Sequence, residues 1–379
     1  MDVVSAVTEF RSGDVLFSKL RPYLEKYALA EFDGKCTGEI LAFAPERIRG
    51  SFLRWAVASP EFIGRCNMLA YGAKMPRVNW PNQLAQFVLP LPPAVEQDRV
   101  AAYLAATCVA LDRAVDRKRE QVRVLNLAWR AELQRAVTRG LSDRPVLRPT
   151  GDPWLAEVPA SWGLRALKRA STTQGGLTLG KTYDGPVIER PYLRVANVQD
   201  GFLDLEDVTT IELPASAAAR VELRRNDVLM NEGGDLDKLG RGCLWNDEIP
   251  GCLHQNHVFA VRCFPHLLDP VFLTHVTASA YGRAYFEATG KRTTNLAATN
   301  STKVGLFPVP TPPLPEQQRI AAFLNERTSE FARLRGNLQR QVETLTAYRR
   351  SLIHECVTGI RRVTQEDLNR VLHHAVLPS

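Results

Sequence analysis

The sequence contains an internal duplication, which constrains the fold more than any other feature. Three blocks occur twice, in the same order and at nearly constant separation. They are GDVLFSKL at 13–20 with NDVLMNEG at 226–233, PPAVEQDRVAAYL at 92–104 with PPLPEQQRIAAFL at 312–324, and WRAELQRAVTRG at 129–140 with YRRSLIHECVTG at 348–359. Chance would rarely preserve the order of three blocks, so the chain is predicted to hold two copies of one structural unit.

Each copy begins with short strand-like runs and leads into a proline-rich extended segment. Aromatic and β-branched residues between turn residues predict strands over 39–43 and 257–261. FVLPLPP at 87–93 and LFPVPTPP at 306–313 follow, and both are expected to form strands because proline forbids a helix there.

A long helix closes each copy, over 96–139 and 316–357. Glu96 and Glu316 lie in the first turns, where a negative charge suits the helix dipole, and Gly140 and Gly359 follow as C-terminal caps. About 42 residues make a helix of about 63 Å.

The apolar residues of these helices form one narrow stripe, with steps of three, four and seven. A helix lying on its own domain would usually show a broader apolar face, so the stripe favours an antiparallel coiled coil between the two helices. The residues expected to pair the helices are Leu104, Leu111, Val115, Val122, Leu125, Trp129, Phe331, Leu334, Leu338, Leu345, Tyr348 and Leu352.

Composition and charge bear on three questions: whether the protein can bind nucleic acid, span a membrane or form disulfides. The 379 residues carry 48 Lys and Arg against 41 Asp and Glu, a net charge of +7 that permits a nucleic-acid partner without requiring one. No run is long and apolar enough for a transmembrane helix, and the first residues do not resemble a signal peptide. The seven cysteines show no CxxC pair and are expected to be buried thiols in a reducing cytoplasm.

Two copies that each end in a block like PPxxEQxRIAxxL and a long helix resemble the specificity (S) subunits of type I restriction–modification enzymes, the HsdS family. DPWLAEVPASWGLRALKR at 152–169 and PYLRVANVQDG at 191–201 are similar to the opening and the first strand and turn of that family's target-recognition domains. The resemblance covers 11–360, and the proline–EQ–helix block is its most specific part.

The resemblance implies an α+β fold in which two similar target-recognition domains are joined by two long antiparallel helices. It implies a non-catalytic, cytoplasmic subunit that reads a bipartite sequence in double-stranded DNA. Two modification (methyltransferase) subunits would dock on it, and restriction (translocase-nuclease) subunits can join them. No cofactor, metal or membrane is expected.

The expected domains differ in completeness. The second copy has 72 positions between Trp154 and Asn226, whereas only 12 residues precede Gly13. Either Met1 is not the natural start or the first recognition domain is truncated. The expected boundaries are a first recognition domain at 1–94, a first long helix at 95–140, a linker at 141–153, a second recognition domain at 154–314, a second long helix at 315–360 and a C-terminal tail at 361–379.

Candidate DNA-contacting residues lie in the loop before each proline segment and just after GDVLF. Arg, Lys, Asn and Thr donate to phosphates and to base edges, although a solvated loop can have the same composition. The candidates are Lys19, Arg21, Lys74, Arg77, Asn79, Lys291, Arg292, Thr293, Thr294 and Asn295.

Two other motifs are interpreted as coincidental. GGLTLGKT at 175–182 fits the P-loop pattern, but a polar segment precedes it and a proline-containing segment without helical period follows it. Cys243, Cys252, Cys263, His254, His257 and His266 cluster with spacings that fit no zinc motif.

The sequence contains no nucleophile elbow and no methyltransferase signature. This agrees with a subunit that recognises DNA while other subunits catalyse the reaction. A rival interpretation from the same features is a coiled-coil scaffold whose two heads bind proteins instead of DNA.

Overall fold

The computed structural model describes residues 7–234, 239–240, 242–292 and 297–376. The chain divides into two compact units. Unit 1 comprises Met1–Arg123 with Arg335–Ser379, and unit 2 comprises Val124–Leu334. Two long helices, α3 (Ala94–Arg139) and α8 (Leu314–Thr358), contribute residues to both units.

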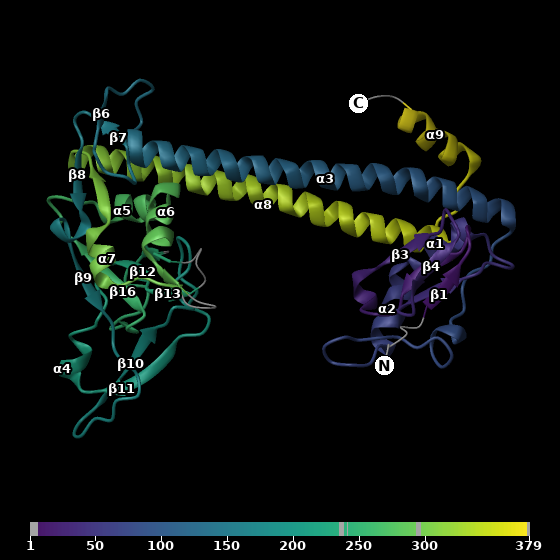
Figure 1. Ribbon diagram of the computed structural model, residues 1–379, viewed down its shortest axis with the longest axis horizontal. Helices are drawn as coiled ribbons and strands as arrows, with labels where there is room; N and C mark the ends of the chain where they lie inside the picture. Colours follow the sequence, from purple (N-terminus) through teal and green to yellow (C-terminus); the bar gives the residue numbers. More distant parts are fainter. Residues whose placement is uncertain (1–6, 235–238, 241, 293–296, 377–379) are drawn as a thin grey trace. The chain divides into compact units, whose positions relative to one another are not determined.

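Unit 1 contains small antiparallel sheets covered by helices (Figure 1). Besides the long helices, its elements are β1 (Val7–Phe10), β2 (Val15–Ser18), β3 (Tyr27–Leu29), β4 (Gly34–Thr37), β5 (Ile40–Phe43), α1 (Gly50–Val57), α2 (Pro60–Leu69) and α9 (Gln365–Val376), with 3-10 turns at Pro22–Leu24 and Leu84–Gln86. The main sheet has the order β3-β2-β5, and β1 pairs with β4.

Unit 2 is larger and contains more strands than unit 1. Its strands are β6 (Leu147–Pro149), β7 (Glu157–Pro159), β8 (Gly163–Ala166), β9 (Ser171–Gly175), β10 (Ile188–Leu193), β11 (Thr209–Leu213), β12 (Val228–Asn231), β13 (Gly233–Gly234), β14 (Gly242–Leu244), β15 (Leu253–His254), β16 (Val258–Cys263), β17 (Lys291–Arg292), β18 (Ala297–Ala298) and β19 (Pro308–Thr311). Its shorter helices are α4 (Ala215–Ala218), α5 (Pro270–Ala278), α6 (Ala280–Thr289) and α7 (Ser301–Leu306), with a 3-10 turn at Leu167–Arg169.

The duplication is visible in the strand pairing. The order β3-β2-β5 in unit 1 recurs as β14-β12-β16 in unit 2, where β9 extends the sheet beyond β16. Val15 pairs with Phe43 in unit 1, and the equivalent Val228 pairs with Val261 in unit 2. The turn before each central strand places Gly13 and Asn226 at positive φ, which only glycine and a few polar residues such as asparagine adopt readily.

The proline segments behave differently in the two copies. Residues 308–311 form β19, which pairs with β8, but residues 87–93 form no strand. The expectation of a strand at 87–93 is therefore wrong. A strand needs a hydrogen-bonded neighbour, and unit 1 has no counterpart of β8 among its described residues.

The long helices end where the sequence predicts. Gly140 and Gly359 follow α3 and α8 in left-handed conformation, with φ of 76° and 79°. Trp162 packs over Gly140, where a Cβ would lie 3.1 Å from the indole ring, so a larger residue there would be strained at this φ and would crowd the ring.

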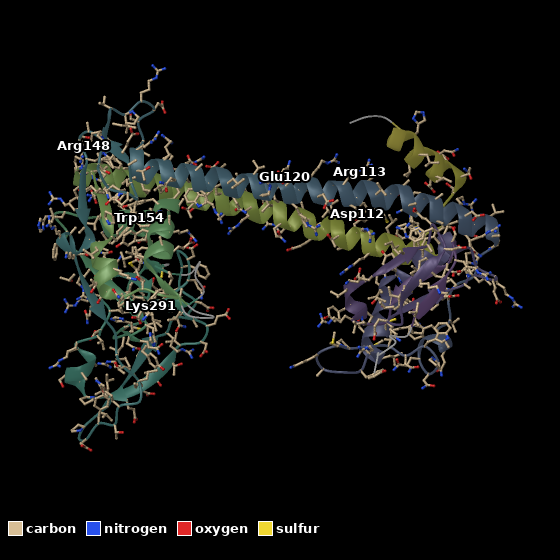
Figure 2. The ribbon with its side chains drawn as sticks, in the orientation of Figure 1. Asp112, Arg113, Glu120, Arg148, Trp154 and Lys291 are labelled. Atoms are coloured by element: carbon tan, nitrogen blue, oxygen red, sulfur yellow. The ribbon has the colours of Figure 1, made fainter. Side chains whose placement is uncertain are left out.

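Within each unit the two long helices run antiparallel. In unit 2, Glu132 of α3 binds Arg327 of α8 at 3.1 Å, and the ring of Trp129 lies 5.2 Å from that of Phe331. In unit 1, Asp112 of α3 binds Arg349 of α8 at 2.9 Å. Exposed charged side chains such as Arg113 and Glu120 cover the outer face of α3 (Figure 2).

The repeated glutamine of the EQ motif connects each long helix to its recognition sheet. The side-chain oxygen of Gln317 accepts from the Asp269 amide at 2.8 Å, at the start of α5, and its nitrogen donates to the carbonyls of Leu267 and Pro312. In the other copy, Gln97 accepts from the Arg49 amide at 2.7 Å, at the start of α1, and donates to Pro92. Both glutamines are buried.

Replacing Gln317 by alanine is expected to lower the free energy of unfolding by about 2 to 4 kcal/mol, because buried backbone groups lose their partners. Thermal or denaturant unfolding of the full chain measures this. Gln318→Ala changes the exposed neighbouring glutamine and should cost less than about 0.5 kcal/mol. Equal losses for the two variants would contradict the role assigned to Gln317.

Candidate nucleic-acid interface

The candidate interface of unit 1 lies where β2 ends and β5 begins. The loop before the proline segment crosses this point: the Val78 amide donates to the Lys19 carbonyl at 3.0 Å, and the Arg21 amide donates to the Pro76 carbonyl at 2.7 Å. The Arg21 guanidinium also donates to the Lys74 carbonyl at 3.3 Å. The structure thus brings together Lys19, Arg21, Lys74 and Arg77, which are far apart in sequence.

The cations of this cluster differ in their partners. Arg77 binds Glu39 at 3.1 Å, and this hydrogen bond, with the charge of Glu39, raises the pKa of the Arg77 guanidinium. Lys19, Arg21 and Lys74 form no ion pair with a carboxylate of the described residues. Their charges are therefore available to an external anion, whereas that of Arg77 is already partly balanced.

Arg21 is held in an unusual conformation. Its φ of 52° places a non-glycine residue in the left-handed region, and its Nε is buried without a hydrogen-bond partner. Such conformations are costly and persist where the surroundings enforce them, often at functional sites. The strain and the unpaired donor both favour Arg21 as a functional residue.

Unit 2 repeats the same backbone arrangement with different side chains. The Glu232 amide donates to the His257 carbonyl at 2.9 Å, as Lys19 does to Glu39 at 3.0 Å, and the Thr299 amide donates to the Glu232 carbonyl, as Val78 does to Lys19. His257 Nδ1 lies 2.7 Å from the Glu232 carboxylate. Glu39, Glu232 and His257 were not among the sequence candidates, although aligning the two copies would have placed them at matching positions.

The predicted loop of unit 2 is described only in part. Lys291 is exposed on β17, which pairs with β18, and β18 also pairs with β13 beside Glu232 (Figure 2). For Arg292 the structure describes the backbone alone, and Thr293, Thr294 and Asn295 lie outside the described residues.

Asn79 has a local structural role. Its side-chain oxygen accepts from the Asn82 amide at 3.3 Å, as the oxygen of Asn300 accepts from the Lys303 amide at 2.9 Å in unit 2. The amide group of Asn79 therefore serves to cap a turn, which leaves its nitrogen for other contacts.

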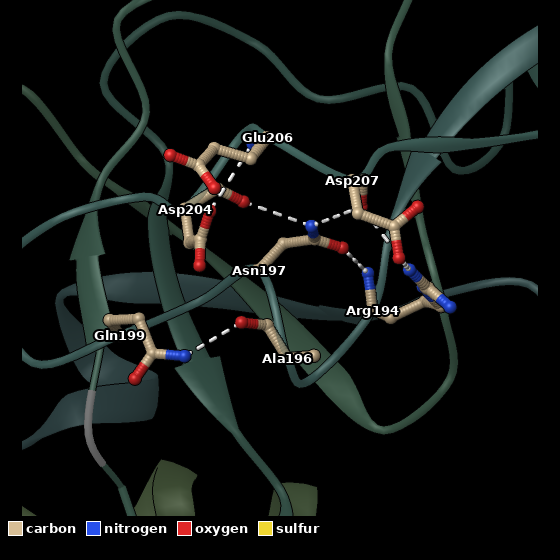
Figure 3. Close-up of polar contacts among 7 residues, drawn as sticks. All are labelled: Arg194, Ala196, Asn197, Gln199, Asp204, Glu206 and Asp207. Carbon is tan, nitrogen blue, oxygen red and sulfur yellow. Dashed lines mark hydrogen bonds and ion pairs between the residues drawn. The ribbon is translucent and has the colours of Figure 1, made fainter. Parts of the chain in front are cut away.

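The PYLRVANVQDG segment forms the end of β10 and the hydrogen-bonded turn that follows it (Figure 3). The buried Asn197 accepts from the Arg194 amide at 2.8 Å and donates to the carbonyls of Asp204 and Asp207. Arg194 also binds the Asp207 carboxylate at 2.8 Å. These contacts give the motif a structural function.

The two motifs interpreted as coincidental lack the geometry of functional sites. GGLTLGKT begins at the end of β9 and continues into irregular chain as far as β10, so no helix follows to bind a phosphate. Among the described residues no group of His, Cys, Asp or Glu is arranged to hold a metal ion. Burial raises the pKa of the Cys243, Cys252 and Cys263 thiols to about 12.

The residues predicted to pair the helices differ in burial. Leu104, Val115 and Leu352 are buried, whereas Leu334 and Tyr348 are 39% and 47% exposed. The others are partly buried: Leu111, Val122, Leu125, Trp129, Phe331, Leu338 and Leu345. Equivalent positions anchor the helix pair in each unit, since Val100, Ala101 and Leu104 pack near Leu352 as Ile320, Ala321 and Leu324 pack near Leu133.

Among curated proteins, the chain is similar to specificity subunits of type I restriction enzymes. It is 24% identical over 206 residues to the MjaX specificity subunit of Methanocaldococcus jannaschii, covering 54% of this chain and 47% of the relative. It is 30% identical over 98 residues to the EcoDI subunit and 27% identical over 164 residues to the EcoBI subunit, both of Escherichia coli. These matches cover 26% and 41% of this chain, and 22% and 35% of the relatives.

Solved structures share the fold over most of the chain. A chain from a structure of the assembly and conformational transition of the type I R-M system matches with a TM-score of 0.73 at 19% identity, covering 93% of this chain and 84% of that one. The HsdS subunit of Thermoanaerobacter tengcongensis matches with a TM-score of 0.52 at 19% identity, covering 92% and 81%.

The chain is therefore similar in sequence to type I specificity subunits over part of its length, and it shares the fold of a solved HsdS subunit over most of it. The α+β fold, with two similar domains joined by two long antiparallel helices, is confirmed. No protein-family model matches the chain. It spans about half the length of the first curated relative. Among the described residues, no helix is both long and apolar enough to cross a membrane.

His254 of β15 is a buried histidine of unit 2 whose ionisation is coupled to folding. Burial lowers the pKa of the His254 imidazole, although its Nδ1 hydrogen bond to the Val258 carbonyl at 2.6 Å opposes the shift. The folded state therefore resists protonation, whereas the unfolded imidazole gains a proton below about pH 6.5.

We expect the free energy of unfolding to fall as the pH drops below about 6.5, by at most about 1.4 kcal/mol per pH unit for this one group. His254→Gln should flatten this dependence, and denaturant titrations between pH 5 and 8 measure it. His266→Gln, which replaces an exposed imidazole, serves as the control. An unchanged slope in His254→Gln would contradict the assignment.

Proposed function

We propose that this chain is the DNA sequence-specificity subunit of a type I restriction–modification complex. The observation that carries the proposal is the repeated interface: the same backbone hydrogen bonds join the strand ends to Val78 in unit 1 and to Thr299 in unit 2, and in unit 1 this arrangement gathers Lys19, Arg21 and Lys74. Unpaired cations next to backbone and amide donors suit a phosphate backbone and base edges. The similarity to named specificity subunits supports the same conclusion.

In this proposal each unit reads one half of a bipartite site in double-stranded DNA, and α3 and α8 set the gap between the halves. A helix of 46 residues corresponds to about 69 Å. The proposed domains keep the boundaries expected from the sequence. The helix-pairing residues would maintain the gap, much as dimer contacts fix half-site spacing in other DNA-binding proteins.

The chain would supply specificity and no catalysis. Two modification (methyltransferase) subunits are the proposed partners, with restriction (translocase-nuclease) subunits joining them in the complete complex, in the cytoplasm. One solved neighbour comes from a structure of type I R-M complex assembly, which supports this class of partner.

Deleting the gene is expected to remove one methylated DNA motif from the genome, and long-read sequencing of the host with and without the gene measures this. Loss of a two-part motif with a fixed gap and different halves would support reading by both units. Loss of a palindromic motif would mean that unit 2 alone specifies the site. An unchanged methylome would contradict the proposed function.

Lys74→Ala is expected to weaken DNA binding by the assembled complex to a similar degree for all sequences, and to reduce the slope of log K against log salt by about 1. Binding titrations at several salt concentrations measure this. Arg47→Ala removes another exposed cation of unit 1 outside the interface and is the control. Equal effects of the two variants would argue for unspecific attraction by the basic surface.

Lys291→Ala tests whether the loop of unit 2 discriminates bases. Loss of one good contact to a base edge costs about 1–3 kcal/mol and relaxes preference at one position. The variant is therefore expected to methylate a broader set of sites, measured by sequencing. Arg144→Ala, in the exposed linker, should leave the motif unchanged. A uniform loss of methylation at all sites would assign Lys291 to phosphate contact instead.

A further inference from the structure

Glu232 places a carboxylate at the point of the unit 2 interface where unit 1 has Lys19. It directly follows the buried strand β12, and its side chain is 26% exposed. Its amide donates to the His257 carbonyl at 2.9 Å, and its carbonyl accepts from the Thr299 amide at 2.7 Å. Because both backbone groups of Glu232 are bonded, the position from which its side chain leaves the backbone is fixed.

The carboxylate of Glu232 is also oriented by a neighbouring side chain. His257 directly precedes β16, and its Nδ1 lies 2.7 Å from Oε2 of Glu232. An ionised carboxylate only accepts hydrogen bonds, so Nδ1 of His257 carries the hydrogen. Within the part of the chain that the structure describes, Oε1 of Glu232 makes no hydrogen bond. This second oxygen is the one that can accept from a ligand.

Two small residues adjoin Glu232. Gly233 follows it and pairs with Ala298, which is exposed. The bridge at the same place in unit 1 joins Leu20 and Arg77, whose side chains are much larger. A glycine within a strand often marks a point where a ligand or another backbone approaches closely. Gly233 and Ala298 therefore leave space for a base edge beside the carboxylate.

The charge of Glu232 limits which groups of DNA it can contact. Phosphates repel a carboxylate, because both are negatively charged. The ammonium group of Lys19 suits a phosphate at this position in unit 1, whereas the carboxylate of Glu232 does not. The exchange of charge therefore favours a contact between Glu232 and a hydrogen-bond donor on a base edge.

Among the base edges of the major groove, a carboxylate matches cytosine best. Cytosine presents the N4 amino donor, whereas adenine presents its N6 amino donor beside the N7 acceptor. Both oxygens of a carboxylate are acceptors, so at adenine one oxygen would face N7 without a hydrogen between them. At cytosine the carboxylate meets the donor alone.

We propose that Glu232 accepts a hydrogen bond from N4 of a cytosine and thereby specifies one C·G pair in the half-site read by unit 2. His257 is its positioning residue, because it holds Oε2 and leaves Oε1 for the base. This inference rests on the proposed function and adds to it the base that one residue recognises.

Glu232→Gln in the full chain, expressed with its partner subunits, tests the assignment. A glutamine amide has one donor and one acceptor and matches N7 and N6 of adenine. Long-read sequencing of the methylome should therefore show one C·G position of the wild-type motif replaced by A·T or broadened to include it. On DNA duplexes that differ only at this position, the ratio of methylation rates for C·G over A·T should fall at least about tenfold. Glu206→Gln, which changes an exposed carboxylate in the turn of Figure 3, should leave the motif unchanged.

His257→Phe removes the hydrogen bond to the carboxylate and should relax a single C·G position without creating a preference for A·T. Such relaxation would support the proposal even if Glu232→Gln methylates too weakly to define a motif. Thermal unfolding of both variants checks that they fold.

Three results would overturn the proposal: an unchanged motif in Glu232→Gln, a uniform loss of methylation in both variants, or a wild-type motif without a C·G pair in either half. A wild-type methylome without any motif that depends on the gene would instead contradict the proposed function itself. The failure of this inference and the failure of the proposed function are thus distinguishable.

Discussion

The buried amide of Gln97 and of Gln317 is the interaction on which the rest of the structure depends. Each side-chain amide binds the N-cap residue of a recognition-domain helix, Arg49 or Asp269, and a carbonyl of the proline segment. The glutamine itself lies in the first turns of the long helix. A buried amide is tolerated only when its donors and acceptors are satisfied, so these bonds allow little freedom in how sheet and helix meet. The position of each candidate interface relative to its long helix follows from this joint.

The helix ends could be predicted from local sequence signals, whereas the strands depend on pairing with segments that are distant in sequence. The ends of α3 and α8 lie within two residues of the expected positions because Glu96, Gly140 and Gly359 act on neighbouring backbone. The proline segments have the same local sequence character, yet only 308–311 forms a strand. The difference arises from β8, about 145 positions earlier in sequence, and no local pattern contains that information.

The sequence predicted the basic residues of the candidate site but not the residues with which they interact. Lys19, Arg21 and Arg77 were selected by residue type, and the structure brings them together through backbone bonds between distant segments. Glu39 and His257 were missed because the sequence marks them as ends of strands, a position that predicts burial and pairing. Their roles as partners of Arg77 and Glu232 depend on the fold of each unit.

The two units share a backbone arrangement at the candidate interface, but the side chains there differ in charge. Lys19 and Glu39 occupy the positions of Glu232 and His257, with the same amide-to-carbonyl bond in each pair. The charge of the first residue is reversed between the copies, while the hydrogen bond that orients it is retained. Because the two units have the same backbone hydrogen bonds but different side chains at equivalent positions, they can present different donors and acceptors to the two halves of a target. Under the proposed function, this divergence is the physical basis for reading an asymmetric bipartite site with one repeated fold.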